Sequence, residues 1–161
     1  MSLTKKIAQQ FKQLHSGGNW TAVNLTTTLA DVDWQTATTK LHDLHTIATL
    51  VFHINYYVKA VMKVLQKEPI NAHDKFSFDC PPIKSQEDWD QLRDKALSDA
   101  AQFANLIEQL PEHMVWEIFV VEKYGNYYRN LIGVIEHTHY HLGQIVLIKK
   151  LILQIPNSNM E

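Results

Sequence analysis

The sequence predicts an all-α fold, a bundle of four main helices in one domain that spans residues 1–161, and three observations support this. Apolar residues recur at steps of three and four along most of the chain, which is typical of amphipathic helices. Residues 35–66 contain neither glycine nor proline. The length of 161 residues allows one domain to bury a core without disulfides, and Cys80 is the only cysteine. We therefore expect a single helical bundle.

The first helix is expected over residues 3–14. The stretch "HSGGN" interrupts it, because Gly17 and Gly18 break a helical pattern. Asn19 is a predicted N-cap for a second segment that starts near Trp20. The two segments are either separate helices or one helix broken near the two glycines.

The second main helix is predicted over residues 35–66, as one long amphipathic element. The following stretch, residues 67–85, is rich in Pro, Asp and Asn and has no sustained period, so we expect a long loop, and loops of this length are often functional. Ser85, with an aspartate three residues later, predicts the start of the third helix. This helix should end near Leu110, before Pro111.

The stretch "EHMVWEIFVVEKYG", residues 112–125, is expected to be a connection. Its β-branched and aromatic residues favour an extended run, and a short helix is the alternative. Asn126 is the predicted cap of a fourth helix over residues 127–154, which should end before Pro156 in a polar tail, residues 155–161. The apolar "MVWEIFVV" is a candidate homodimer interface, with burial inside the monomer as the alternative.

Composition and charge exclude several classes of partner. Lys plus Arg number 15 against 17 Asp plus Glu, and neither sign forms a long block, so we expect no nucleic-acid partner. The N-terminal stretch lacks the apolar core of a signal peptide, and no segment approaches 18 uninterrupted apolar residues, so we expect no membrane partner. The lone Cys80 fits a reducing compartment. These features predict a cytoplasmic protein.

The stretch "IEHTHYHLGQI" carries three of the nine histidines. On a helix, His137 and His141 lie four residues apart along the edge of the apolar stripe, whereas His139 points to a different sector. Two imidazoles at this spacing can bind one metal ion, although such pairs are also found buried and hydrogen-bonded without metal. Gly143 permits close approach of a neighbouring backbone, and Gln144 is placed to support a ligand.

A third ligand is expected on the predicted helix of residues 35–66, which carries His42, His45 and His53. At a helical rise of about 1.5 Å per residue, His42 and His53 would lie about 16 Å apart, so only one of the three can join the pair. His53 lies deepest in the apolar run, and His42 and His45 lie near the helix start, where a solvated role is expected. The pattern favours His53.

These stretches resemble the DinB/YfiT-like superfamily of four-helix-bundle proteins. The family pattern is one histidine on the second helix, followed by an aromatic residue, and an H-x-x-x-H pair on the last helix, followed by G-Q. Here the stretches are "HINYYVKAV" and "GVIEHTHYHLGQIVLIKK", and the matching residues are His53, Tyr56, Tyr57, His137, His141, Gly143 and Gln144. The early "NWTAVNLTTTLADVDW" is also similar to the N-terminal segment of the family, so the likeness covers most of the chain.

The resemblance implies one divalent metal ion, nickel, zinc or iron(II), held by His53, His137 and His141 with a position open to water. Three imidazoles plus solvent form a catalytic rather than a closed structural arrangement, and imidazole alone does not select the metal. Tyr57 and Gln144 are candidates for the pocket around the ligands. The general base and the residues that bind a thiol remain unassigned.

The resemblance further implies a metal-dependent transferase that adds a low-molecular-weight thiol of the bacillithiol type to small electrophiles. In such an enzyme the metal would lower the pKa of the cofactor thiol. One alternative is a metal-dependent hydrolase, in which the metal would activate water. Another is a stress-associated metal-binding or dimerisation module without turnover. A di-iron ferritin-like site ranks last, because it uses Glu-x-x-His from two helices, whereas this sequence holds that motif only once, from Glu136 to His139.

Overall fold

Four long helices form the framework of the computed structural model, which describes residues 1–70 and 72–154. They are α1 (Leu3–Ser16), α4 (Ile47–Leu65), α5 (Gln86–Gln109) and α6 (Tyr127–Leu153). Shorter elements lie between them: α2 (Leu25–Leu29), α3 (Trp34–Thr38) and the 3₁₀ helices η1 (Asp74–Phe76), η2 (Glu112–Trp116) and η3 (Glu122–Tyr124). The described residues thus form an all-helical bundle without a β-strand, as the sequence predicts. The predicted polar tail, residues 155–161, lies outside the described residues.

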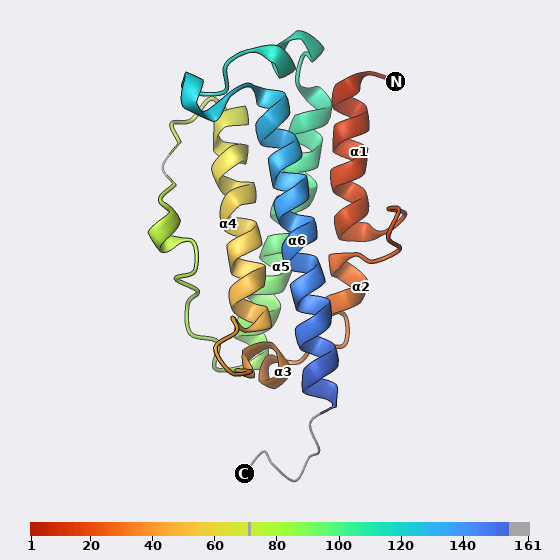
Figure 1. The fold of residues 1–161 in the computed structure, drawn as a ribbon, viewed down its shortest axis with the longest axis vertical. Helices are drawn as coiled ribbons and strands as arrows, with labels where there is room; N and C mark the ends of the chain where they lie inside the picture. The colour runs from red at the N-terminus through yellow and green to blue at the C-terminus, as the bar shows by residue number, and fades with distance from the viewer. Residues whose placement is uncertain (71, 155–161) are drawn as a thin grey trace.

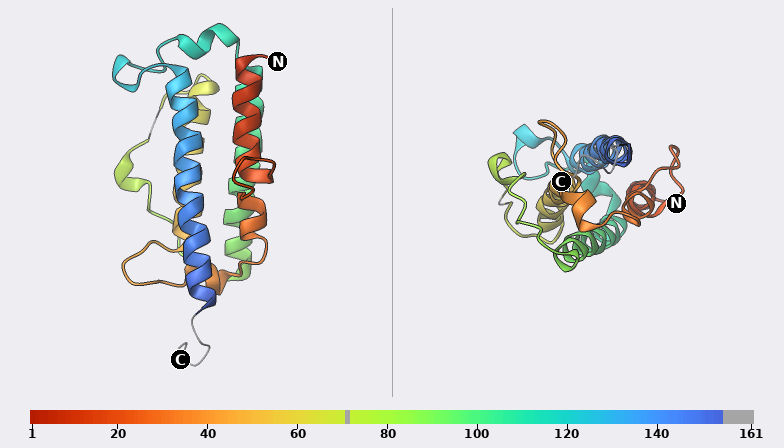
Figure 2. Two further views of the ribbon diagram at one scale, coloured as in Figure 1. Left: turned by 45° about the vertical axis from the view of Figure 1, so that its right-hand side comes forward. Right: turned by 90° about the horizontal axis from the view of Figure 1, so that it is seen from below.

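The four long helices contact one another in a closed ring, in the order α1, α5, α4, α6 and back to α1. Figure 1 shows that α4 and α5 run in the same direction, whereas α1 and α6 run opposite to them. Parallel neighbours need a connection that returns along the whole bundle. The segment between α4 and α5, described over residues 66–70 and 72–85, fills this role, and we call it the strap. Figures 1 and 2 show it on the outer side of α4. The long loop predicted over residues 67–85 is confirmed for its described residues.

Side-chain caps explain where the helices begin. The side-chain oxygens of Ser85 and Asn126 accept hydrogen bonds from the N–H groups of Asp88 and Arg129, at the starts of α5 and α6. Such caps satisfy backbone donors that have no partner within the helix. The predicted starts of both helices are therefore confirmed.

The predicted break after the first helix is confirmed, but the predicted cap is wrong. Helix α1 ends at Ser16, and Gly17 and Gly18 adopt φ angles of 104° and 87°, which glycine reaches without strain. Asn24, not Asn19, caps the next helix. The Asn19 side chain instead donates to the Val23 carbonyl oxygen at 2.8 Å, and so closes a turn.

The prediction of one helix over residues 35–66 is also wrong in its first third. The chain leaves the helical conformation at Thr39, where ψ is 124°, and His42 has a φ of 47°. Thr46 then caps α4, because its hydroxyl accepts from the Thr49 N–H. No glycine or proline lies at this interruption. Instead, the first helix ends at Thr39, and the cap formed by Thr46 starts the next one. As a consequence, His42 and His45 lie in a loop.

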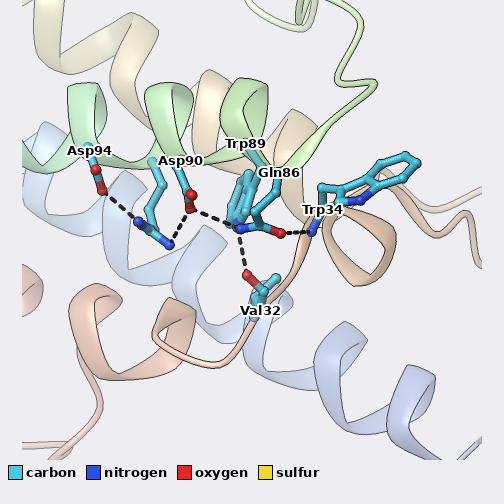
Figure 3. A network of polar contacts seen from close by, with 7 residues as sticks. Val32, Trp34, Gln86, Trp89, Asp90 and Asp94 are labelled. Atoms are coloured by element: carbon cyan, nitrogen blue, oxygen red, sulfur yellow. Dashed lines mark hydrogen bonds and ion pairs between the residues drawn. The ribbon is translucent and has the colours of Figure 1, made fainter.

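Polar contacts fasten the start of α5 to the segment around α3. The indole N–H of Trp89 donates to the Val32 carbonyl oxygen at 2.7 Å, and the Trp34 N–H donates to Gln86 Oε1 at 3.1 Å (Figure 3). The Gln86 amide also donates to Asp90 Oδ1 at 3.0 Å. Trp89 is fully buried, so its N–H needs the partner that Val32 supplies. This network fixes the end of the bundle from which α4 and α5 both start.

The core lies between the four long helices. Its largest fully buried side chains come from all of them, and include Phe11, Leu50, Phe103 and Ile145. The ring of Phe103 meets that of Phe11 edge to face, with centroids 4.9 Å apart. Across residues 1–70 and 72–154, no helix combines the length and apolar character that a membrane crossing requires.

The connection between α5 and α6 is neither extended nor one short helix. It contains η2 and η3, with an isolated antiparallel bridge between Ile118 and Asn126. Val115 and Phe119 are buried in the monomer, whereas Trp116 and Ile118 are exposed. Monomer burial therefore accounts for Val115 and Phe119, two of the seven apolar residues of "MVWEIFVV", and the homodimer interface stays a prediction.

Candidate metal centre

Two adjacent long helices bring three histidines together. His53 lies on α4, and His137 and His141 lie one turn apart on α6, which packs against α4. Ring nitrogens of the three side chains lie within 4.8 Å of one another, and 3.0 Å separates Nε2 of His53 from Nε2 of His137. The three residues selected from the sequence thus form one cluster, contributed by segments 84 positions apart in the chain.

The strap orients His53. Nδ1 of His53 lies 3.1 Å from the carbonyl oxygen of Ser77, and because a carbonyl only accepts, Nδ1 must carry the proton. This tautomer leaves a free lone pair on Nε2, the nitrogen that faces His137. The Phe78 ring also stacks on the His53 imidazole, with centroids 3.7 Å apart. Carbonyl acceptors of this kind commonly fix metal-binding histidines.

Gln144 orients His141 in the same way. Its Oε1 lies 2.6 Å from Nδ1 of His141, so Nδ1 donates and Nε2 keeps its lone pair. The contact spans three residues along α6, which is the spacing that made Gln144 a candidate in the sequence. The structure therefore places Gln144 directly behind a predicted ligand.

Tyr57 contributes its ring rather than its hydroxyl. The ring packs edge-on against His53 and His137, with centroid distances of 5.2 and 4.7 Å. The hydroxyl donates to Oδ1 of Asp74 in the strap at 2.8 Å. Burial, followed by the hydrogen bond to Asp74, raises the pKa of Tyr57, so the phenol stays protonated at neutral pH. Tyr57 forms a wall of the cluster and a second anchor for the strap.

All three histidines are neutral near pH 7. Burial, helped by the nearby imidazoles of His141 and His53, lowers the pKa of His137 to about 4. Burial is also the main cause of the lowered pKa values of His53 and His141. Neutral imidazole is the form that binds metal ions. The three imidazoles therefore need not lose a proton before they bind a metal ion.

The donor set fits a divalent ion. Two nitrogens that each lie about 2.0–2.1 Å from one zinc ion are separated by about 3–3.4 Å, and the 3.0 Å between His53 and His137 agrees. Nδ1 of His137 is buried with no hydrogen-bond partner among the described residues, so the tautomer of His137 is not fixed by a contact like those of His53 and His141. Three imidazoles leave coordination positions open, as in catalytic rather than structural sites. The residues can therefore hold a metal ion, and its identity is not fixed by them.

The remaining histidines lie outside the cluster. His139 is exposed, and its Nε2 lies 3.3 Å from the Thr21 hydroxyl. His15 is buried, and its Nδ1 bonds to the Phe11 carbonyl oxygen. His45 stacks on Phe78, with centroids 4.2 Å apart, although its loop position differs from the helical one expected. The separation of His139 from its two neighbours follows the helical spacing, as predicted.

Sequence reasoning missed Ser77, Phe78 and Asp74, the strap residues that touch His53 or Tyr57. No periodicity or motif marks them, because a backbone carbonyl carries no side-chain signature and the path of the strap depends on tertiary packing. The only sequence signal was indirect: the length of the loop that contains them suggested a functional role.

A cavity of about 250 Å³ lies beside Gln144, and none of the three clustered histidines lines it. Leu50, Leu147 and Ile148 are apolar lining residues, and Asp43, His45 and Gln144 are polar ones. Gln144 also bonds to His141, so the cavity reaches the residue directly behind a predicted ligand. A small molecule with an apolar part fits this space.

We expect the purified protein to carry one divalent ion per chain and His137→Ala to lose it, because two imidazoles bind far more weakly than three. Elemental analysis after gel filtration measures this. His139→Ala removes an exposed histidine from the same helix and should retain the ion. A metal-free native protein, or equal metal in His137→Ala, would contradict the site.

Gln144→Leu should keep all three ligands yet weaken metal binding by about 10–100-fold, because His141 loses the acceptor that fixes its tautomer. Competition with a chromophoric chelator measures the affinity. Gln109→Leu, at the far end of α5, is the matched control and should bind as the native chain does. An unchanged affinity in Gln144→Leu would show that the contact does not support the site.

No protein-family model matches the chain, and neither curated proteins nor solved structures contain a match to it. The DinB/YfiT-like resemblance therefore stays a prediction, and the case for function rests on the residues of this chain.

Proposed function

We propose that the protein is a metal-dependent transferase of the DinB/YfiT-like type, which adds a low-molecular-weight thiol of the bacillithiol type to small electrophiles. The observation that carries the proposal is the convergence of three neutral imidazoles from α4 and α6. When bound there, a divalent ion would lower the pKa of a thiol and hold it as thiolate. Zinc, nickel and iron(II) all suit this donor set.

The reaction is a substitution that balances without a further reactant. The thiol releases its proton to solvent water, its sulfur bonds to the electrophilic carbon, and the bond from that carbon to the leaving group breaks, so that the leaving group departs as an anion. His53, His137 and His141 hold the ion, and the cavity beside Gln144 receives the electrophile. A reducing cytoplasm, where small thiols stay reduced, is the compartment that this reaction requires.

The thiol must come from outside the chain. Cys80 is the only cysteine, and burial raises the pKa of its thiol to about 11. It therefore stays protonated at neutral pH, and its Sγ points to the Ala48 carbonyl oxygen at 3.8 Å. A thiol in this state is a poor nucleophile, which favours an exogenous thiol cofactor.

The ligand group itself holds no carboxylate among the described residues, and Asp43 lies in the lining of the neighbouring cavity rather than in that group, which favours the transferase over the hydrolase. A hydrolase needs a general base within reach of the activated water. Among the described residues, the ligand cluster contains histidines alone, and the nearby Asp74 accepts the hydrogen bond of Tyr57. A thiolate attacks directly and requires no such base.

The zinc-, nickel- or iron-loaded protein should accelerate conjugation of 1-chloro-2,4-dinitrobenzene with at least one of bacillithiol, cysteine, coenzyme A and glutathione. His53→Ala removes a ligand, so kcat/KM should fall by roughly two orders of magnitude or more. Absorbance of the dinitrophenyl thioether follows the reaction.

His139→Ala should conjugate at the native rate, since its side chain lies outside the cluster. Hydrolysis of p-nitrophenyl acetate without any thiol would instead support the hydrolase. If no thiol is conjugated by the metal-loaded protein and His53→Ala alters stability alone, the transferase proposal is lost and the non-catalytic metal-binding module remains.

A further inference from the structure

A second cavity, of about 380 Å³, lies beside a different face of α4, where α5 and the strap meet that helix. Its volume falls within the range of about 300–1,000 Å³ that is usual for small-molecule sites. None of the three histidines of the metal cluster lines it. Its lining is mixed: Phe52, Leu92 and Pro81 are apolar, and Lys59 and Lys63 are basic.

The charged side chains that line this second cavity are all basic. Three lysines line it, with no acidic side chain among the described lining residues. Lys95 pairs with the buried Asp99, so its charge is compensated. Within the described part of the chain, neither Lys59 nor Lys63 forms an ion pair of its own. Two uncompensated ammonium groups therefore face one small cavity.

The spacing of these two lysines costs helix stability. Lys59 and Lys63 lie four residues apart on α4, and like charges at this spacing repel. An anion between them removes the repulsion and gains charge-assisted hydrogen bonds. Their positions thus suit a bound anion better than an empty surface.

The chemistry of the lining selects the kind of anion. Lysine ammonium groups act as point charges and are common phosphate binders, whereas the planar, two-pronged recognition of carboxylates is a property of arginine. A phosphate monoester carries a charge of about −1.5 to −2 at neutral pH, which matches two ammonium groups. A single carboxylate leaves one of them uncompensated.

We propose that this second cavity binds a small organic phosphate monoester, with its phosphate between Lys59 and Lys63 and its apolar part against Phe52 and Leu92. The site is separate from the metal cluster, and the proposal does not depend on the transferase activity.

Phenyl phosphate is a suitable probe, with calorimetry on the metal-loaded protein as the measurement. Lys59→Gln/Lys63→Gln should weaken its binding roughly tenfold or more, because each replacement removes one charge contact. Lys5→Gln/Lys150→Gln makes the same change in net charge on other faces and should bind as the native chain does. Lys59, Lys5 and Lys150 are exposed and Lys63 is half-buried, and circular dichroism should show native helix content in both double variants.

Three further measurements decide the class of ligand. Benzyl alcohol, which is neutral, and inorganic phosphate, which has no apolar part, should each bind at least tenfold more weakly than phenyl phosphate. Benzoate should bind more weakly as well. Equal binding of phenyl phosphate to the Lys59→Gln/Lys63→Gln protein, or equal binding of benzyl alcohol, overturns the proposal.

The metal cluster is tested as a competing location. His137→Ala, which should lose the ion, must still bind phenyl phosphate if the second cavity is the site. Loss of binding in His137→Ala with retention in Lys59→Gln/Lys63→Gln would place the phosphate on the metal instead, and would overturn the inference without touching the transferase proposal.

Discussion

The hydrogen bond from His53 to the Ser77 carbonyl is the contact on which the candidate site depends most. It joins a candidate ligand on a rigid helix to a segment with little regular structure, and it decides which nitrogen of His53 keeps a lone pair. With the opposite tautomer, the Nε2 proton of His53 would point toward His137 and oppose a shared ion. One backbone carbonyl in the strap therefore controls the chemistry of the cluster.

The strap exists because α4 and α5 run in the same direction. Parallel helices cannot be joined by a short turn, so the chain must travel back along the bundle. On this path it contacts α4 through Tyr56, Tyr57 and His53. The topology thus supplies a second layer of contacts behind a helix that carries a ligand. The same crossing encloses the lysine-lined second cavity with α4 and α5.

Much of the fold was predictable from local signals. The starts of α5 and α6 follow from Ser85 and Asn126, whose side chains cap the helices independently of the tertiary structure. The break between α3 and α4 was not predictable from glycine or proline, because Thr39 and Thr46 end and restart the helix there. Apolar periodicity continues across the interruption, since both segments pack against the same core.

The residues of the candidate site likewise fall into two groups, those that local sequence signals reveal and those that depend on tertiary packing. His137 and His141 emerge from helical spacing alone, and His53 from its place in an apolar run, because each signal is local. Ser77 and Phe78 could not be found in this way, since they act through a backbone carbonyl and a stacking contact set by the course of the strap. Gln144 lies between the two cases: its spacing from His141 is local, but the contact depends on the side-chain conformation.

X-ray absorption at the zinc edge of the zinc-loaded protein tests the central claim most directly. A centre built from these histidines predicts three imidazole nitrogens at about 2.0–2.1 Å, with further coordination by light atoms from solvent. Fewer than three imidazoles, or a sulfur scatterer at about 2.3 Å from Cys80, would contradict a centre built from His53, His137 and His141.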